Sequence, residues 1–167
     1  MTGKQKPLVY VIMGVSGCGK TTVGRALSKR LGCPFYDGDD FHPPENVAKM
    51  ASGMPLTDAD RAPWLARLHD LLAQELGRGE TAVLACSALK KAYRDQLRQG
   101  LDGVQFVYLR GDFDLIWERM RTRRDHYMKA DMLRSQFADL EEPAGGEALI
   151  IDAAADVPAI VAQILHR

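Results

Sequence analysis

The segment from Gly14 to Thr21 has residue types and a spacing that suit the binding of a nucleoside triphosphate. It reads Gly-Val-Ser-Gly-Cys-Gly-Lys-Thr and fills the pattern G-x-x-x-x-G-K-[ST] directly after a short apolar run. Glycines let backbone N–H groups turn toward phosphate oxygens, and the helix N-terminus that follows adds positive potential. In this chemistry Lys20 reaches the β- and γ-phosphates and Thr21 ligates Mg²⁺. The predicted nucleotide-binding residues are Gly14, Val15, Ser16, Gly17, Cys18, Gly19, Lys20, Thr21 and Thr22.

A phosphate-binding loop of this type serves kinases, GTPase switches and motor ATPases, so other residues must discriminate. A GTPase needs an N-K-x-D guanine reader and a D-x-x-G switch, but the only asparagine is Asn46 and no aspartate is followed three residues later by glycine. A motor ATPase needs a carboxylate at the end of an apolar strand, and the run 82–86 is followed by Ser87 instead. The pattern favours a small-molecule kinase, with a nucleotide-binding switch as the weaker alternative.

The acidic run Asp37-Gly-Asp-Asp40 is the best source of further carboxylates. It follows a short strand candidate, 34–37, and would lie beside the phosphate-binding loop if that strand neighbours the first one. Asp37 would then hold Mg²⁺ through water, and Asp39 would orient the hydroxyl that accepts the phosphoryl group. The alternative is a solvated acidic loop without a ligand.

A basic cluster follows the helical pattern around Trp117. Its density suits a mobile lid, at about residues 121–135, that closes on the triphosphate and screens negative charge in the transition state. An ordinary solvated helix face is the alternative. The cluster consists of Arg119, Arg121, Arg123, Arg124, Lys129 and Arg134.

Short apolar runs alternate along the chain with helical patterns. The runs 8–13, 82–86, 104–109 and 148–151, with 34–37 as a fifth, are typical of strands covered on both faces. Strands that alternate with helices predict an α/β fold with a parallel sheet and right-handed crossovers. Thr57 with Asp60 three residues later predicts a helix start, and Gly77 its end. No linker or repeat divides the chain, so residues 1–167 are predicted to form a single domain.

The amino-acid composition limits the classes of binding partner that the chain is expected to have. Lysine plus arginine equal aspartate plus glutamate at 22 each, so no bulk charge favours a nucleic acid or an anionic membrane as a partner. The apolar run 8–13 is too short for a signal core or a membrane span. Cys18, Cys33 and Cys86 form no CxxC pair and suit a reducing cytoplasm.

Several motifs together resemble the gluconokinase family of P-loop kinases, relatives of the shikimate and nucleoside monophosphate kinases. The most specific are Asp-Gly-Asp with His-Pro-x-x-Asn at 37–46, Asp-x-Asp-Arg-x-x-Trp-Leu at 58–65 and Cys-Ser-Ala-Leu-Lys at 86–90. His-Tyr-Met at 126–128, Ser-Gln at 135–136 and Leu-Glu-Glu-Pro at 140–143 extend the match over nearly the whole chain. The Arg-Pro-Leu-Leu lid signature of shikimate kinases is absent.

The resemblance implies a P-loop NTPase fold, with a five-stranded parallel sheet, helices on both faces and a mobile lid. It implies ATP and Mg²⁺ as cofactors and the phosphorylation of D-gluconate at its 6-hydroxyl to give 6-phospho-D-gluconate. Another P-loop small-molecule kinase, shikimate-like or acting on a nucleoside monophosphate, is the alternative. Members of the family are commonly cytoplasmic and dimeric, and the expected partners include no nucleic acid and no membrane.

Similarity to the acceptor site of shikimate kinases implies that Arg61 binds the substrate carboxylate, with Arg94 or Lys90 assisting. Arginine suits this role because its planar fork pairs with a carboxylate through two bonds. The resemblance also implies that Arg119 stacks over adenine, while the segment 152–155 closes over the other side of the base. The remaining candidates are His42, Asn46 and Ser87 for the substrate hydroxyls, His126 for the substrate, and Arg123 for the nucleotide.

Overall fold

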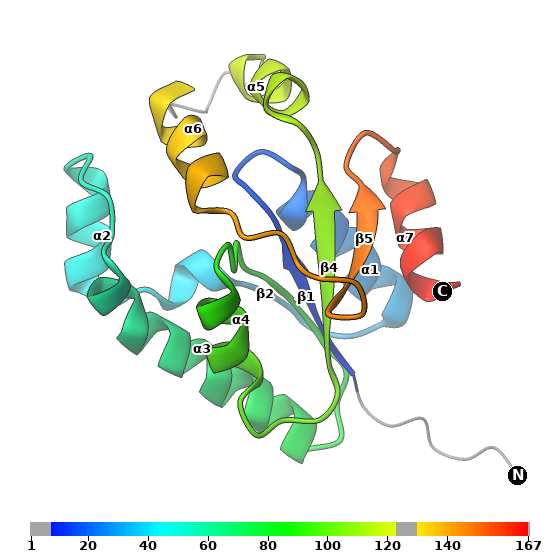
Figure 1. The fold of residues 1–167 in the computed structure, drawn as a ribbon. Coiled ribbons are helices and arrows are strands. Elements are labelled where there is room, and N and C mark those ends of the chain that lie inside the picture. The colour runs from blue at the N-terminus through cyan, green and yellow to red at the C-terminus, as the bar shows by residue number, and fades with distance from the viewer. Residues whose placement is uncertain (1–7, 123–129, 167) are drawn as a thin grey trace, which may run out of the picture.

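A computed structural model describes residues 8–122 and 130–166 of the chain. A parallel five-stranded sheet in the order β2-β3-β1-β4-β5 forms its centre (Figure 1). The elements in chain order are β1 Val9–Met13, α1 Lys20–Leu31, β2 Phe35–Asp37, the 3₁₀ helix η1 Gly38–Phe41, α2 Pro44–Ala51, α3 Asp58–Gly77, β3 Ala82–Ala85, α4 Lys91–Arg98, β4 Val104–Arg110, α5 Phe113–Arg121, α6 Ala130–Asp139, β5 Ala148–Asp152 and α7 Val157–Leu165.

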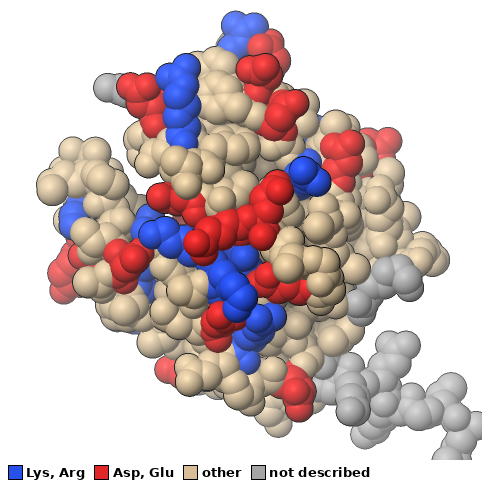
Figure 2. Space-filling model, viewed as in Figure 1, with Lys and Arg blue, Asp and Glu red and all other residues tan. Residues whose placement is uncertain are grey.

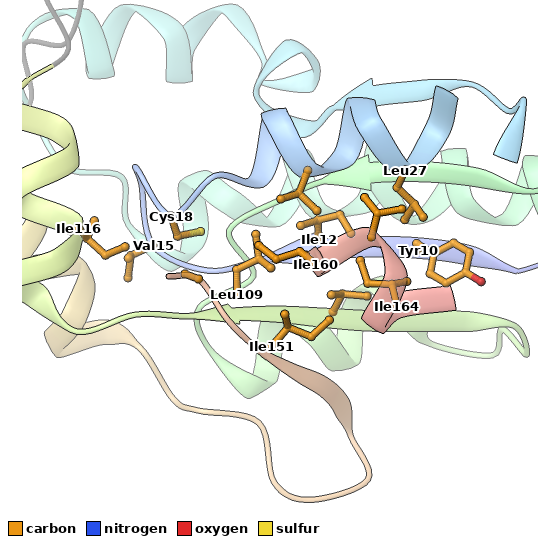
Figure 3. Packing of buried hydrophobic residues seen from close by; sticks show 14 of the residues in the cluster. Tyr10, Ile12, Val15, Cys18, Leu27, Leu109, Ile116, Ile151, Ile160 and Ile164 are labelled. Atoms are coloured by element: carbon orange, nitrogen blue, oxygen red, sulfur yellow. The ribbon is translucent and has the colours of Figure 1, made fainter. Parts of the chain in front are cut away.

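The alternation of side chains along the buried strands gives each face of the sheet its own core. On one face, Tyr10 and Ile12 of β1 pack with Leu27 of α1 and Ile164 of α7 (Figure 3). On the other face, the intervening residues of β1 pack against α3 and α4. Every residue of β1 and β3 is buried. The predicted α/β architecture with helices on both faces is confirmed.

The predicted ends of α3 are confirmed. Thr57 Oγ1 accepts a hydrogen bond from the Asp60 amide at 3.1 Å, and Asp60 Oδ2 accepts one from the Thr57 amide at 2.8 Å. This reciprocal cap satisfies two of the N–H groups that a helix start leaves without partners. Because the cap fixes the first turn of α3, it also fixes Arg61 and Trp64, which follow within the next two turns.

β2 does not neighbour β1, so the condition for placing the acidic run directly beside the phosphate-binding loop is not met. β2 pairs with β3 through Phe35↔Val83 and Asp37↔Ala85, so β3 separates it from β1. The acidic turn still passes close over the end of β3, because a Cβ atom at Gly38 would lie only 2.7 Å from the Ala85 carbonyl oxygen. A small residue in the turn and a small residue ending β3 therefore bring the carboxylates to the central strands.

α5 lies beyond the carboxyl end of β4, and α6 lies beside the loop that follows β1 (Figure 1). The carboxyl ends of parallel strands are where α/β proteins bind ligands. Within residues 8–122 and 130–166, no helix is both long enough and apolar enough to cross a membrane.

Candidate active site

The phosphate-binding loop depends on glycine at three places. Gly14, Gly17 and Gly19 have φ angles of 144°, 82° and 104°, which side chains rarely allow. A Cβ at Gly17 would lie 2.5 Å from Met120 Cγ, and one at Gly14 would lie 2.8 Å from Cys18 Sγ. Apart from Gly19 itself and its two chain neighbours, no described residue has a heavy atom within 4 Å of the Cβ position at Gly19, which caps α1. The loop is thus packed from behind by protein and open at the N-terminus of the helix, as a cradle for phosphate requires.

Lys20 lies folded over this loop. Its Nζ atom donates to the carbonyl oxygens of Gly14 at 3.0 Å and Val15 at 2.9 Å. The ammonium is therefore held at the mouth of the cradle by neutral acceptors. Phosphate oxygens are stronger acceptors for an ammonium than carbonyl oxygens are, so a bound polyphosphate can take it over.

Gln136 of α6 is a contact that sequence reasoning missed. Its Oε1 atom accepts from the Ser16 amide at 2.7 Å, and its Nε2 atom donates to Ser16 Oγ at 2.9 Å. The two residues are 120 positions apart. This pair of hydrogen bonds ties the helix after the expected lid to the phosphate-binding loop. The Ser-Gln motif at 135–136 was the only signal for it in the sequence.

The acidic turn is held from two sides. Asp37 Oδ1 accepts from the Asp39 amide at 3.0 Å and so caps η1. Trp64 of α3 donates its indole N–H to the Gly38 carbonyl oxygen at 2.7 Å. The turn between the two aspartates is therefore fixed to the rigid helix α3 rather than left as a free loop.

The electrostatics of Asp39 reflect its neighbours. Partial desolvation by surrounding protein atoms, and then the charge of Asp37, raise the pKa of Asp39 above its ordinary value, while Lys20 acts in the opposite direction. The Asp39 side chain is nonetheless 85% exposed. Water therefore screens these charges in the open cleft, and they gain strength only where a ligand excludes it.

His42 and Asn46 lie together in a buried position next to this turn. The His42 ring stacks on Trp64 with a centroid separation of 4.2 Å and an interplanar angle of 14°. Asn46 Nδ2 lies 3.2 Å from His42 Nδ1 and donates to the Asp60 carbonyl oxygen at 2.8 Å. His42 Nε2 lies 3.9 Å from Asp39 Oδ1. Burial, and then the charge of Arg61, lower the pKa of His42, so the imidazole is neutral at neutral pH.

Arg61 and Lys90 come together at the start of α3 and α4. Arg61 NH1 donates to the Tyr93 hydroxyl at 3.0 Å, and Lys90 Nζ lies 3.3 Å from Asp58 Oδ1. Tyr93 donates to the same Asp58 oxygen, which is 4.0 Å from Arg61 NH1. The hydrogen bond from Tyr93, followed by that from Lys90, lowers the pKa of Asp58. Sequence reasoning named both cations but neither Asp58 nor Tyr93 as their partners.

Arg94 is not in the acceptor cleft, which corrects the expectation that it assists with the substrate carboxylate. Its side chain is 1% exposed and forms an ion pair of 2.8 Å with Glu147 through Nε. NH1 and NH2 donate to the carbonyl oxygens of Ala88, Leu89 and Glu141. With every guanidinium nitrogen engaged, Arg94 holds the loop after β3 to the segment before β5.

The structure describes some of the other expected site residues but not all of them. Ser87 follows β3, and its carbonyl oxygen accepts from the Gly14 amide at 3.2 Å, which brings it to the phosphate-binding loop. Arg119 lies on α5 and is half-buried. Arg123 and His126, with most of the expected lid, lie outside the described residues. Among the residues that the structure describes, no cluster of three or more His, Cys, Asp or Glu side chains is arranged to hold a metal ion. Mg²⁺ bound by one or two protein oxygens and phosphates needs no such cluster.

A hollow of about 670 Å³ lies at the carboxyl ends of β4 and β5. Asp152 and Ala154, from the segment expected beside adenine, are among its lining residues, which also include Arg110 and Leu115 of the facing segment. No residue of the phosphate-binding loop lines it. The hollow therefore adjoins the expected base-binding segment and not the cleft that holds Lys20 and Asp39.

The chain is similar in sequence and in fold to known kinases of small metabolites. A gluconokinase of Gluconobacter oxydans (strain 621H) is 48% identical over 97% of this chain and 91% of its own length. The chain belongs to the gluconokinase family. The thermoresistant gluconokinase of Escherichia coli (strain K12), another member, is 43% identical over 95% of this chain and 91% of its own.

A crystal structure of a gluconokinase from Sinorhizobium meliloti 1021 agrees in fold with a TM-score of 0.87. It is 43% identical in sequence and covers 97% of this chain and 91% of its own. The model of the shikimate kinase family also matches residues 16–166, so this gluconokinase-family chain falls within that broader group of P-loop kinases. The predicted family and the predicted P-loop kinase fold are confirmed, whereas the mobile lid stays a prediction.

Proposed function

We propose that this protein is a gluconokinase that transfers the γ-phosphoryl group of ATP to the 6-hydroxyl of D-gluconate. The observation that carries the proposal is the 48% identity to a gluconokinase over nearly the full length of both chains. The cleft supports it, because a phosphate cradle, an exposed carboxylate and a pair of cations lie at the carboxyl ends of neighbouring strands.

Residues 14–22 would hold the phosphates of ATP through the open N-terminus of α1. Lys20 would leave its carbonyl partners for the β- and γ-phosphates, where charge accumulates in a loose transition state. The Thr21 hydroxyl would ligate Mg²⁺ and Asp37 would hold it through water. Bound Mg²⁺ supplies charge neutralisation on the phosphates. The donor set fits, since these are oxygen atoms and Mg²⁺ prefers oxygen ligands.

The acceptor would bind between α3 and α4. Arg61 and Lys90 would take the substrate carboxylate, which replaces or joins Asp58 as their partner. Asp39 would accept a hydrogen bond from the 6-hydroxyl and aim it at the γ-phosphorus. Positioning matters here more than proton removal, because the transition state is largely dissociative. Ser87, whose carbonyl oxygen bonds to the Gly14 amide of the phosphate-binding loop, would hydrogen-bond a hydroxyl of the acceptor.

Arg119 would stack on adenine, and the basic residues that follow would close over the phosphates as a lid, with Arg123 on the nucleotide and His126 on the substrate. Closure would exclude water, which otherwise competes as an acceptor. The hydrogen bonds between Gln136 and Ser16 support a link between the lid and the bound phosphates, since they join α6 to the phosphate-binding loop. Family resemblance further supports a cytoplasmic location and a homodimer, and light scattering of the purified protein would test the dimer.

A coupled assay of ADP release tests the function. Gluconate, shikimate, adenosine monophosphate, cytidine monophosphate and a buffer blank are compared under the same conditions. We expect turnover well above the blank with gluconate alone, and none with Lys20→Ala, which controls for a contaminating kinase. Preference for shikimate or a nucleoside monophosphate would identify the alternative acceptor class. Equal turnover with and without any acceptor would overturn the assignment as a kinase.

A further inference from the structure

The amide of Asn46 can be oriented without ambiguity. The Asp60 carbonyl oxygen can only accept, so the Asn46 atom 2.8 Å from it must be the nitrogen Nδ2. The same nitrogen lies 3.2 Å from His42 Nδ1. An amide nitrogen carries two hydrogens and accepts none, so it donates one to Asp60 and the other to His42. His42 Nδ1 is therefore an acceptor, and in a neutral imidazole the proton must then be on Nε2.

Packing and hydrogen bonding restrict reorientation of the His42 ring. The His42 side chain is 4% exposed and lies flat on Trp64, whose own N–H is fixed to the Gly38 carbonyl oxygen. Asn46 is 4% exposed and anchored to α3. With Nδ1 turned to Asn46, the Nε2–H group faces Asp39 Oδ1 at 3.9 Å. That separation is too long for a direct hydrogen bond, but one hydroxyl oxygen can bridge the two groups.

We infer that Asn46 is a positioning residue that holds His42 as the neutral Nε2–H tautomer. In this form His42 donates to the oxygen of a substrate hydroxyl whose proton Asp39 accepts. The hydroxyl is then fixed by a donor and an acceptor at once, so its remaining lone pair has a defined direction. The identity of the hydroxyl rests on the proposed function, whereas the tautomer does not.

The surroundings of the ring agree with a neutral donor. The charged groups that face His42 are Asp39 from η1 and Arg61 from α3. Protonation would place an N–H on Nδ1 directly against the Asn46 amide hydrogens, so two donors would meet in a buried space. Asn46 thus makes the charged imidazolium costly, in the same direction as burial and Arg61.

The tautomer can be read in the ligand-free wild-type protein by long-range ¹⁵N–¹H correlation spectra of the imidazole rings at neutral pH. We expect His42 to show a bare Nδ1 and a protonated Nε2; His42→Phe assigns its signal among the four histidines. A protonated Nδ1 or an imidazolium would overturn the inference. In Asn46→Asp the new carboxylate accepts from Nδ1–H, so the proton should appear on Nδ1. Retention of the Nε2–H form there would show that Asn46 does not set it.

Steady-state kinetics with gluconate test whether His42 donates a hydrogen bond to the substrate. His42→Phe keeps the stacked ring without the N–H and should lower kcat/KM for gluconate by about twofold to tenfold, the usual range for a hydrogen bond between uncharged groups. The KM for ATP should not change. His42→Gln can place an amide N–H near the former Nε2 and should recover part of the loss. His69→Phe, far from the cleft on α3 and bonded to the Gln99 carbonyl, is the matched control.

Wild-type gluconate kinetics in His42→Phe would overturn the donor role. If the wild-type protein shows no gluconate-dependent turnover at all, the proposed function fails, and the spectra alone then decide the tautomer. The two failures are therefore distinguishable.

Discussion

Replacing Arg94 by methionine should destabilise the protein and leave nucleotide binding intact. The variant removes the ion pair with Glu147 and the donors to the carbonyl oxygens of Ala88, Leu89 and Glu141. The Glu147 side chain is 9% exposed, so its charge stays buried without a partner. Breaking a buried pair from one side commonly costs about 3–5 kcal/mol. For a domain of this size, each kcal/mol shifts Tm by roughly 2–4 °C, so we expect a fall of about 6–20 °C.

Thermal unfolding followed by circular dichroism gives the measurement, with ATP affinity by calorimetry as the check on folding. The double variant Arg94→Met with Glu147→Met should recover part of the loss, because it removes the unpaired charge while the three carbonyl oxygens still lack their donor. An unchanged Tm in Arg94→Met together with a raised gluconate KM would return Arg94 to the acceptor site and refute this reasoning.

The same pair predicts a pH dependence of stability. Burial alone would raise the pKa of Glu147, but the hydrogen bonds from Arg94 and from the Ala144 amide lower it below its ordinary value. A folded-state pKa below that of the unfolded chain, about 4.3, means that the stabilisation is complete above that pH and is lost as the pH falls through the folded value. Arg94→Met should therefore show a smaller loss of Tm than the wild type between neutral pH and acid.

The remaining predictions concern the cleft. Lys20→Ala should abolish turnover in a folded protein, because it removes the charge that meets the β- and γ-phosphates; near-normal rates would disprove the cradle. Arg61→Leu should raise the gluconate KM far more than the ATP KM. Asp58→Asn removes the competing carboxylate and should lower the gluconate KM. If Asp58→Asn instead raised the KM for gluconate and the KM for ATP, Asp58 would be a structural support. Asp39→Asn should lower kcat by about two orders of magnitude or more. Raised Mg²⁺ should partly rescue Asp37→Asn but not Asp39→Asn, and the reverse in a magnesium titration would mean that the two roles are exchanged.

The fold was predictable because its signals are local. Each strand is recognisable as a short apolar run of residues. The residues of the loop 14–21 by themselves indicate a glycine-rich turn, the start of a helix and the lysine that meets the phosphates. The place of β2 was not predictable in this way. Pairing with β3 or with β1 depends on contacts between segments that are distant in the chain, and a three-residue strand carries little pattern of its own.

The sequence did contain a pattern that indicates a buried position for Arg94. On α4 the buried residues are Tyr93, Arg94 and Leu97, at the spacing of one apolar stripe. Arg94 thus occupies a core position on its helix, although its residue type favoured a ligand site. Its partners are up to 53 positions away, and only the folded chain reveals that they satisfy it. The contact between Ser16 and Gln136 escaped for the same reason.

The charges around the acceptor site bear on which acceptor can bind. Lys and Arg side chains lie among Asp and Glu side chains in a band across the middle of the face seen in Figure 2. Among the side chains that pair directly in this cluster, Arg61 and Lys90 face the carboxylate of Asp58, which leaves one net positive charge, while Asp139 acts on Lys90 from farther away. A carboxylate monoanion balances this charge, but a phosphate monoester, with about 1.5 to 2 negative charges near neutral pH, exceeds it. Uncompensated charge is costly where water is excluded, so the cluster discriminates against a nucleoside monophosphate by repulsion as well as by fit. The Asp58 side chain is 68% exposed in the open cleft, so we expect it to influence the choice of acceptor only once a bound acceptor excludes water from the cluster.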